Sequence, residues 1–276
     1  MKTRYLLDTS AFCALPSRIL QEHTFYASPY CFWELLTHLD EGSFDQYKGQ
    51  LMKFKYAHIL NDPRAEIEVP LLIDDNQLQD RVSDEELIAA ALAALQDSNS
   101  LDMFYSSYVE DSKGNLHQVS ECAANVRKAL GEAEQKHTEF VENIMNVFRT
   151  GQVKLETYSD YHQAILQLLE GEMIKLQQRG AVDKDLRNKL TNNSYIYYSY
   201  VFHRALAYFR KGKTKLDVND FEDSQVCLHL RLDTPYCLVT ADKGLKEALD
   251  KTSALLNQLN ELDTHTDLRV LDVKDF

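Results

Sequence analysis

Short apolar runs alternate with amphipathic stretches at both ends of the chain. Runs rich in Leu, Val, Tyr and Phe predict strands, and windows with apolar residues three and four positions apart predict helices. The predicted strands are "YLL" at 5–7, "TFYAS" at 24–28, "YCLVT" at 236–240 and "LRVLDV" at 268–273. The predicted helices are 9–21, bent at a proline, 29–42, 218–232 and 242–259. Because strands and helices alternate over short links, the two ends predict one α/β domain with a parallel sheet.

The middle of the chain has a different pattern. Apolar residues recur at helical spacing over 118–149 and 155–179, with few Gly or Pro residues between them, which predicts long helices. We therefore predict an α/β fold whose central parallel sheet is interrupted by a long all-helical insertion. Residues 1–44 would form the first half of the α/β core, 45–211 the insertion and 212–276 the second half.

One stripe in this middle region is mostly aromatic. It consists of Tyr195, Tyr198, Phe202, Ala205 and Phe209. Residues spaced in this way share one face of a helix, and such a face is usually packed in a core. We favour that interpretation over a platform on which nucleic-acid bases stack.

Composition indicates a folded chain outside the membrane. Hydrophobic residues make up 44% of the 276 residues, so a packed core can form. No apolar run approaches the roughly 20 residues that span a bilayer, and the start "MKTRYLLDTS" lacks the apolar stretch of a signal peptide. We expect a soluble, cytoplasmic protein with no membrane partner. The five cysteines, an odd number without a CxxC pair, predict neither disulfides nor a zinc site.

The net charge of −13 at first argues against a nucleic-acid partner. However, residues 62–111 hold eight Asp and five Glu against two Arg, so this segment carries −11 of that charge. The rest of the chain is close to neutral. The acidic segment is an ordinary solvated surface, a contact for a basic protein partner, or a nucleic-acid mimic, and we favour the first. Homodimer formation is left open.

Two predicted strands end on acidic side chains. Asp8 follows "YLL", and Thr240 and Asp242 follow "YCLV". In open parallel sheets, ligands bind outside the carboxyl ends of the strands, so both carboxylates could face one crevice. Taken singly, each Asp is better explained as the N-cap of the helix that follows.

Three further acids lie on predicted helices. Glu34 has mostly apolar sequence neighbours in "CFWELL", and a buried carboxylate must pair, bind a cation or reach water; alternatively, Glu34 lies on a solvated helix face. Asp220 and Asp223 share one face at the start of "DFEDSQVC". There they either complement the helix dipole or lie over the same crevice as Asp8.

In this order, the four stretches resemble the PIN-domain nuclease family. The matching stretches are "YLLDTS", "SPYCFWELL", "NDFEDSQVCLHL" and "YCLVTADKGL", within about 110 residues at the two ends of the chain. The resemblance implies a PIN-like three-layer fold. It also implies a catalytic and metal-binding set of Asp8, Glu34, Asp223 and Asp242, with Asp220 and Thr240 as accessory residues. The insertion is longer than the helical segment of compact members of the family.

The implied activity is phosphodiester hydrolysis that depends on Mg²⁺ or Mn²⁺, with single-stranded RNA favoured over DNA as substrate. Hard oxygen ligands suit these ions. Two alternatives stay open. A different phosphoryl-transfer enzyme would be expected to have a second acid two residues after Asp8, where the chain has Ser10. A non-catalytic PIN-like scaffold would instead bind a protein partner through the insertion.

A nuclease also needs cations to hold phosphates. A basic cluster precedes the Asp220 helix and consists of Arg204, Arg210, Lys211, Lys213 and Lys215. These residues are candidates for guiding the nucleic-acid backbone. We weight a solvated helix end with favourable cations above this binding track.

Overall fold

The protein has an α/β fold built around a parallel sheet. The computed structural model describes residues 3–61, 84–110, 114–151, 153–178, 183–213, 217, 219–233, 236–259 and 268–276. The sheet has five strands in the order β3-β2-β1-β6-β7, and every pairing is parallel. Its strands are β1 (Arg4–Leu7), β2 (Phe25–Ala27), β3 (Ala57–Ile59), β6 (Tyr236–Thr240) and β7 (Arg269–Asp272). The predicted α/β class and parallel sheet are therefore confirmed, and the helices around the sheet are compatible with three layers.

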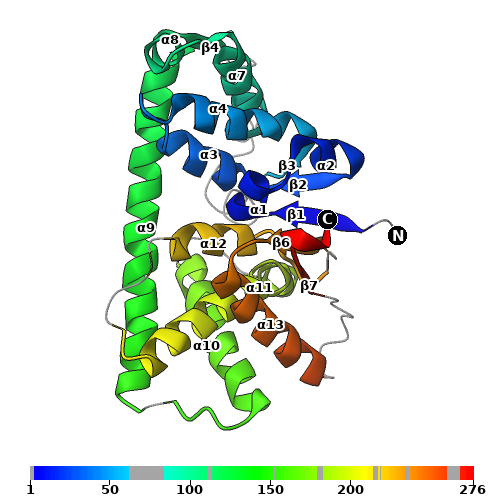
Figure 1. The fold of residues 1–276 in the computed structure, drawn as a ribbon. Coiled ribbons are helices and arrows are strands. Elements are labelled where there is room, and N and C mark those ends of the chain that lie inside the picture. The colour runs from blue at the N-terminus through cyan, green and yellow to red at the C-terminus, as the bar shows by residue number, and fades with distance from the viewer. Residues whose placement is uncertain are drawn as a thin grey trace.

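Helices make up most of the rest of the described chain (Figure 1). The first half contains α1 (Thr9–Ala14), α2 (Ser17–Glu22), α3 (Pro29–Thr37), α4 (Phe44–Leu51), the 3-10 helix η1 (Met52–Tyr56), α7 (Asp84–Asp97) and α8 (Leu101–Ser106). The second half contains α9 (Val119–Arg149), α10 (Tyr158–Gln177), α11 (Lys184–Arg210), α12 (Asp220–Cys227), α13 (Lys243–Gln258) and the 3-10 helix η2 (Val273–Asp275). Helix α9 runs along one side of the molecule for most of its length.

Short polar side chains fix where many of these helices begin. Asp8 accepts a hydrogen bond from the backbone N–H of Ala11 at the start of α1. Ser28 caps α3, which has Pro29 in its first turn, a position where proline loses no helical hydrogen bond. Asp242 caps α13. Because the Ncap side chain satisfies an otherwise unpaired N–H, each helix starts where the sequence places such a residue.

The region predicted as an all-helical insertion contains three strands, so that part of the prediction is wrong. Strand β3 pairs with β2 at one edge of the central sheet, and β4 (Tyr108–Glu110) and β5 (Leu116–Gln118) form an antiparallel pair. Each of the three has only three residues. An alternating pattern cannot be recognised over such a length. The predicted boundary at residue 45 therefore divides the strands of one sheet.

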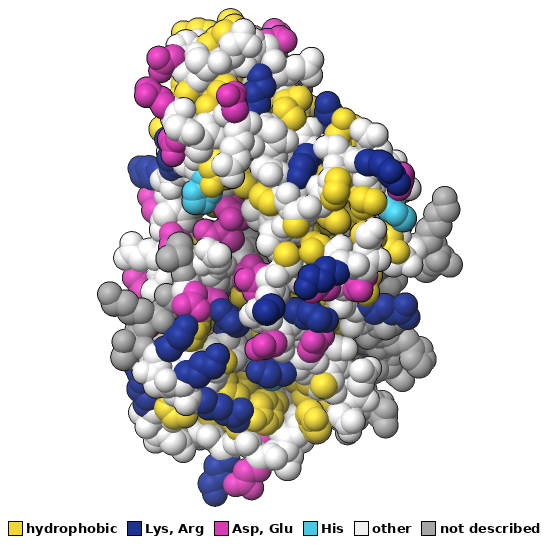
Figure 2. All heavy atoms as spheres, in the orientation of Figure 1, with side chains coloured by type: hydrophobic (Ala, Val, Ile, Leu, Met, Phe, Trp, Pro, Cys, Tyr) yellow, Lys and Arg dark blue, Asp and Glu magenta, His cyan; other side chains and the backbone are white. Residues whose placement is uncertain are grey.

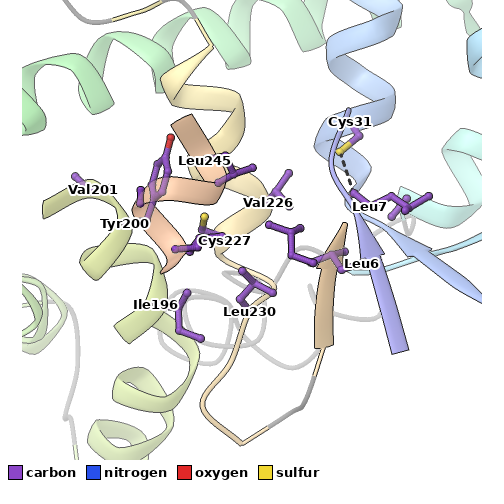
Figure 3. Close-up of a cluster of buried hydrophobic side chains, with 14 of the residues drawn as sticks. Leu6, Leu7, Cys31, Ile196, Tyr200, Val201, Val226, Cys227, Leu230 and Leu245 are labelled. Atoms are coloured by element: carbon purple, nitrogen blue, oxygen red, sulfur yellow. Dashed lines mark hydrogen bonds between the residues drawn. The ribbon is translucent and has the colours of Figure 1, made fainter. Parts of the chain in front are cut away.

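Helix α11 packs in the core that also holds both ends of the chain. Ile196, Tyr200 and Val201 of α11 lie among Leu6 of β1 and side chains of α12 and α13 (Figure 3). In the aromatic stripe of α11, four side chains are buried and Phe209 is 37% exposed. The preferred core interpretation is thus confirmed for all but the last residue of the stripe.

The two ends of the chain close around this core. Strand β7 pairs with β6, and the ring of the last residue, Phe276, packs edge-on against Tyr5 with centroids 5.1 Å apart. All five cysteines lie in described parts of the chain, and none of them forms a disulfide. Within the described residues, no helix is both long and apolar enough to cross a bilayer. Nearly half of the acidic 62–111 segment, its residues 62–83 and 111, lies outside the described residues.

Candidate acidic site

The candidate site lies where strand order reverses in the sheet. β2 and β3 lie on one side of β1, whereas β6 and β7 lie on the other. The backbone N–H of Asp8 continues the β1–β6 pairing by donating to the carbonyl of Val239 at 3.3 Å. Asp8 and Thr240 therefore end neighbouring strands at the same edge. This is the place where open α/β sheets bind ligands.

Asp8 is buried and held by three neutral donors. Its side chain is 2% exposed. The backbone N–H of Ala11 donates to Oδ1 at 2.7 Å, Thr240 Oγ1 donates to Oδ2 at 2.6 Å, and Ser10 Oγ donates at 2.8 Å. Burial raises the pKa of Asp8 to about 6, and the nearby charge of Asp242 adds to the rise, against the lowering effect of these hydrogen bonds. No cation is paired with this carboxylate in the described structure.

Thr240 connects the two strand-end acids. While its hydroxyl donates to Asp8, the same oxygen accepts from the backbone N–H of Asp242 at 2.8 Å. Asp242 Oδ1 accepts from the backbone N–H of Leu245 at 2.7 Å as the cap of α13. Its Oδ2 accepts no hydrogen bond from the described residues. Both strand-end acids are therefore helix caps, and Thr240 joins them at the same edge of the sheet.

Asp223 joins this pair from the first turn of α12. Burial raises its pKa well above the ordinary value, and the charges of Asp242 and Asp8 raise it further. Among the described residues, its carboxylate accepts one hydrogen bond, a long one from Tyr200 Oη to Oδ2 at 3.4 Å. Three acids that are far apart in sequence thus repel one another at one edge of the sheet.

Glu34 lies beside this group on α3. Thr9 Oγ1 donates to its Oε2 at 2.6 Å. Burial raises the pKa of Glu34 to about 7, and the charges of Glu222 and Asp8 contribute. Figure 2 shows acidic side chains in the middle of the visible face, at the level between α3 and α12 in Figure 1. Glu34 is therefore next to Asp8, and its other acidic neighbour is Glu222.

Sequence reasoning missed two residues at this position. The first is Glu222 of α12, whose Oε2 is buried without a hydrogen-bond partner among the described residues and whose pKa is raised by burial. Thr9 was not singled out. A clue to Glu222 was its place one residue before Asp223 in "DFEDSQ", but spacing along one helix could not show that it faces Glu34 on another.

Asp220 has a different environment from the other acids. It is 3% exposed and is bound by Arg204, whose Nε donates to Oδ1 at 2.8 Å, by the hydroxyl of Tyr208 and by the backbone N–H of Asp217 at 3.1 Å. Gly244 leaves space for the guanidinium, because a Cβ there would come within 2.7 Å of Arg204 Nη1. Asp220 is thus neutralised within the protein, next to Asp223.

The predicted basic cluster is divided by the structure. Arg204 points inward to Asp220, with an 18% exposed side chain. Lys213 pairs with Asp217 at 3.0 Å, Arg210 donates to Tyr161 Oη at 3.0 Å, and Lys211 is exposed. Lys215 lies outside the described residues. Arg204 is thus placed as a structural cation, whereas Arg210, Lys211 and Lys213 follow one another at the solvent-accessible end of α11.

The donor atoms at this edge suit a hard divalent cation. Carboxylate and hydroxyl oxygens are the ligands that Mg²⁺ and Mn²⁺ prefer, and Asp223 Oδ1 and Asp242 Oδ2 accept no hydrogen bond from the described residues. As the described side chains stand, no group of three or more His, Cys, Asp or Glu residues is close enough to hold one ion. The acids interact in the pairs given above.

Comparisons with known proteins leave the family open. No protein-family model, no curated protein and no solved structure matches this chain. The resemblance to PIN-domain nucleases therefore stays a prediction from four short stretches of sequence, and the case for a function depends on the arrangement of the acids.

The raised pKa of Glu34 predicts a pH-dependent stability. Its folded pKa of about 7 lies above the ordinary 4.5, so protonation stabilises the fold fully below about pH 4.5, and this stability is lost as pH rises through about 7. Glu34→Gln removes the ionisable group, so this stability is no longer lost as pH rises. Without metal we expect the variant to be more stable than wild type by up to about 3 kcal/mol at pH 8 and equal to it at pH 4.5.

Urea denaturation in EDTA at the two pH values measures this difference. Glu41→Gln, at an exposed position just after the same helix, serves as the matched control and should change neither value. If Glu34→Gln gave the same change in unfolding free energy at both pH values, the proposed burial of a charged Glu34 beside Asp8 would be wrong.

Proposed function

We propose that the protein is a divalent-metal-dependent nuclease of the PIN-like type that hydrolyses single-stranded RNA. The observation that carries this proposal is that Asp8, Asp223 and Asp242, from the end of β1, from α12 and from the end of β6, lie close enough for their charges to raise the pKa values of Asp8 and Asp223. A fold gains no stability from buried acids that repel one another. A bound cation that balances their negative charge would explain why these acids lie together.

The chemistry explains why acids would serve an anionic substrate. On their own they would repel a phosphodiester, but a bound Mg²⁺ or Mn²⁺ reverses the local charge, polarises the phosphate and stabilises the leaving oxygen. Asp8, Asp223 and Asp242 would hold the ion. Thr240 and Ser10 orient the Asp8 carboxylate by hydrogen bonds to its oxygens.

Glu34 is suited to accept a proton from the attacking water. A general base works best when its pKa is near the working pH, and burial places the pKa of Glu34 at about 7. The hydroxyl of Thr9 fixes the position of Oε2. Asp220 and Arg204 would act indirectly. Their ion pair holds the start of α12, where Asp223 lies, against α11.

Phosphates on either side of the cleaved bond need cations. In the same view, Lys and Arg side chains gather below the central acidic residues (Figure 2). Arg210, Lys211 and Lys213, together with Lys215, are proposed to hold the backbone of the strand through release of counterions. RNA is favoured over DNA on the family resemblance alone.

The test is cleavage of a labelled single-stranded RNA by the purified protein. We expect cleavage with Mg²⁺ or Mn²⁺ and none in EDTA, with a DNA strand of the same sequence cut more slowly. Equal cleavage in EDTA would reject a metal-dependent mechanism. Thermal unfolding is the second measurement, since an ion bound only to the folded state raises Tm. If Mn²⁺ neither activates the protein nor raises its Tm, the non-catalytic scaffold becomes the better proposal.

A further inference from the structure

A pocket lies away from the acidic site, between α10, α11 and α13. Its volume is about 410 Å³, within the range of small-molecule sites. Lys251, in its wall, is nine residues beyond Asp242 on α13, which is about 13 Å along a helix. The pocket is therefore a separate place from the edge of the sheet where the acids meet.

One wall of this pocket contains an imidazole that is almost fully buried. His203 is 6% exposed, and its Nε2 is buried without a hydrogen-bond partner among the described residues. The ring of Tyr161 stacks on it at 6.0 Å with an angle of 28° between the planes. Burial lowers the pKa of His203 to about 4, with contributions from Lys251 and Arg210, so the ring is neutral near pH 7. The two rings therefore give this wall of the pocket a flat and uncharged aromatic surface.

The rim of the pocket is cationic. Arg210, Lys211 and Lys251 all line it, and no Asp or Glu does so among the described residues. Arg210 is held in place by its hydrogen bond to Tyr161 Oη. Tyr158, 52% exposed, adds an aromatic surface beside these charges. The opening therefore attracts anions, whereas the interior offers flat and apolar surfaces, including Leu206 and Leu255.

We propose that this pocket binds a nucleoside phosphate, with the base against Tyr161 and His203 and the phosphate at Arg210, Lys211 and Lys251. The inference deepens the proposed nuclease function and rests on it, since it gives the substrate strand a second point of attachment. A base has a flat face that can stack on these aromatic rings. A phosphate pairs with several cations at once. A simple inorganic anion would leave the interior unused.

Two sources could supply this chemistry, a nucleotide within a strand or a free nucleotide, and binding measurements separate them. Isothermal titration calorimetry of the full chain in EDTA, which prevents metal-dependent cleavage, would use adenosine 5′-monophosphate, inorganic phosphate and a short single-stranded RNA. We expect the mononucleotide to bind more tightly than phosphate. Tighter binding of the strand would identify the strand as the source, and equal binding would identify the free nucleotide.

Variants then test whether the nucleotide binds in this pocket. Lys251→Gln, at an exposed position on α13, is expected to weaken nucleotide binding about tenfold, as loss of a charged hydrogen bond does. Lys128→Gln, the same change at an exposed site on α9 that does not line the pocket, should leave it unchanged. His203→Leu removes one of the two aromatic rings proposed to face the base, so it should weaken binding of the nucleotide and not of inorganic phosphate.

Several outcomes would overturn the proposal. These are absence of nucleotide binding, equal binding of phosphate and nucleotide, or equal effects of Lys251→Gln and Lys128→Gln. The cleavage assay keeps this failure apart from that of the nuclease. Cleavage without binding at the pocket would reject the pocket alone, whereas nucleotide binding that depends on Lys251, without cleavage under any metal condition, would reject the nuclease and retain the site.

Discussion

Asp8→Asn is expected to abolish metal-dependent cleavage of RNA while the protein stays folded. Asparagine keeps the size of the side chain and an oxygen that can accept from the N–H of Ala11, so the cap of α1 persists. It removes the charge that would hold the cation. Removal of a residue that is central to catalysis lowers rates on the order of a thousandfold or more. Single-turnover cleavage with saturating Mg²⁺ measures the loss, and thermal unfolding in EDTA checks the fold.

The matched control is Asp272→Asn. Asp272 ends β7, another strand of the same sheet, but its side chain caps η2 by accepting from the N–H of Lys274. The control should therefore cleave RNA at close to the wild-type rate. Full activity of a folded Asp8→Asn protein, or equal losses in both variants, would contradict a catalytic role for the acids at the β1–β6 edge.

The strand-end acids show how much of the site the sequence could predict. Asp8 and Asp242 were weighed as helix caps against ligands at a sheet edge, and the structure makes both of them caps. The two roles are compatible, because a cap uses one carboxylate oxygen and leaves the other available to a ligand. Apolar runs and cap residues are local signals, so the strands β1 and β6 and the helices that follow them could be read from short windows.

The parts that could not be predicted depend on contacts between distant segments. β3 has three residues and belongs to the sheet only because it pairs with β2. Glu222 becomes part of the acidic group because α12 brings it opposite Glu34 on α3. The inward direction of Arg204 requires the missing side chain of Gly244, forty residues later. Helical spacing gives the face on which a residue lies, but not the element that the face meets.

The ion pair of Arg204 and Asp220 also separates the acids into two groups. Asp220 has a cation, two hydroxyl or N–H donors and little exposure, so it is satisfied within the protein. Among the described residues, the carboxylate of Asp223, three residues later on the same helix, accepts only the long bond from Tyr200. Asp220 thus fixes the start of α12, and Asp223 lies near Asp8 and Asp242. A residue predicted to bind RNA, Arg204, has instead a structural position.

Arg204→Met is therefore expected to destabilise the fold strongly. Methionine fills part of the same space but leaves Asp220, 3% exposed, without its cation. Removing one partner of a buried pair costs about 3–5 kcal/mol, because the other charge stays buried and uncompensated. Chemical denaturation at pH 7.5 in EDTA measures the loss. We expect the double variant Arg204→Met with Asp220→Asn to regain much of it, since the buried charge is then gone.

Arg210→Met provides the matched control for this prediction. It makes the same change six residues later on α11, where the guanidinium bonds among the described residues only to Tyr161 Oη, at an exposed position. Its effect on stability should therefore stay within about 0.5 kcal/mol. Suppose instead that Arg204→Met unfolded no more easily than Arg210→Met and bound single-stranded RNA more weakly. Arg204 would then act on the substrate, as its place in the basic cluster first indicated, and Asp220 would carry no buried charge that needs a partner.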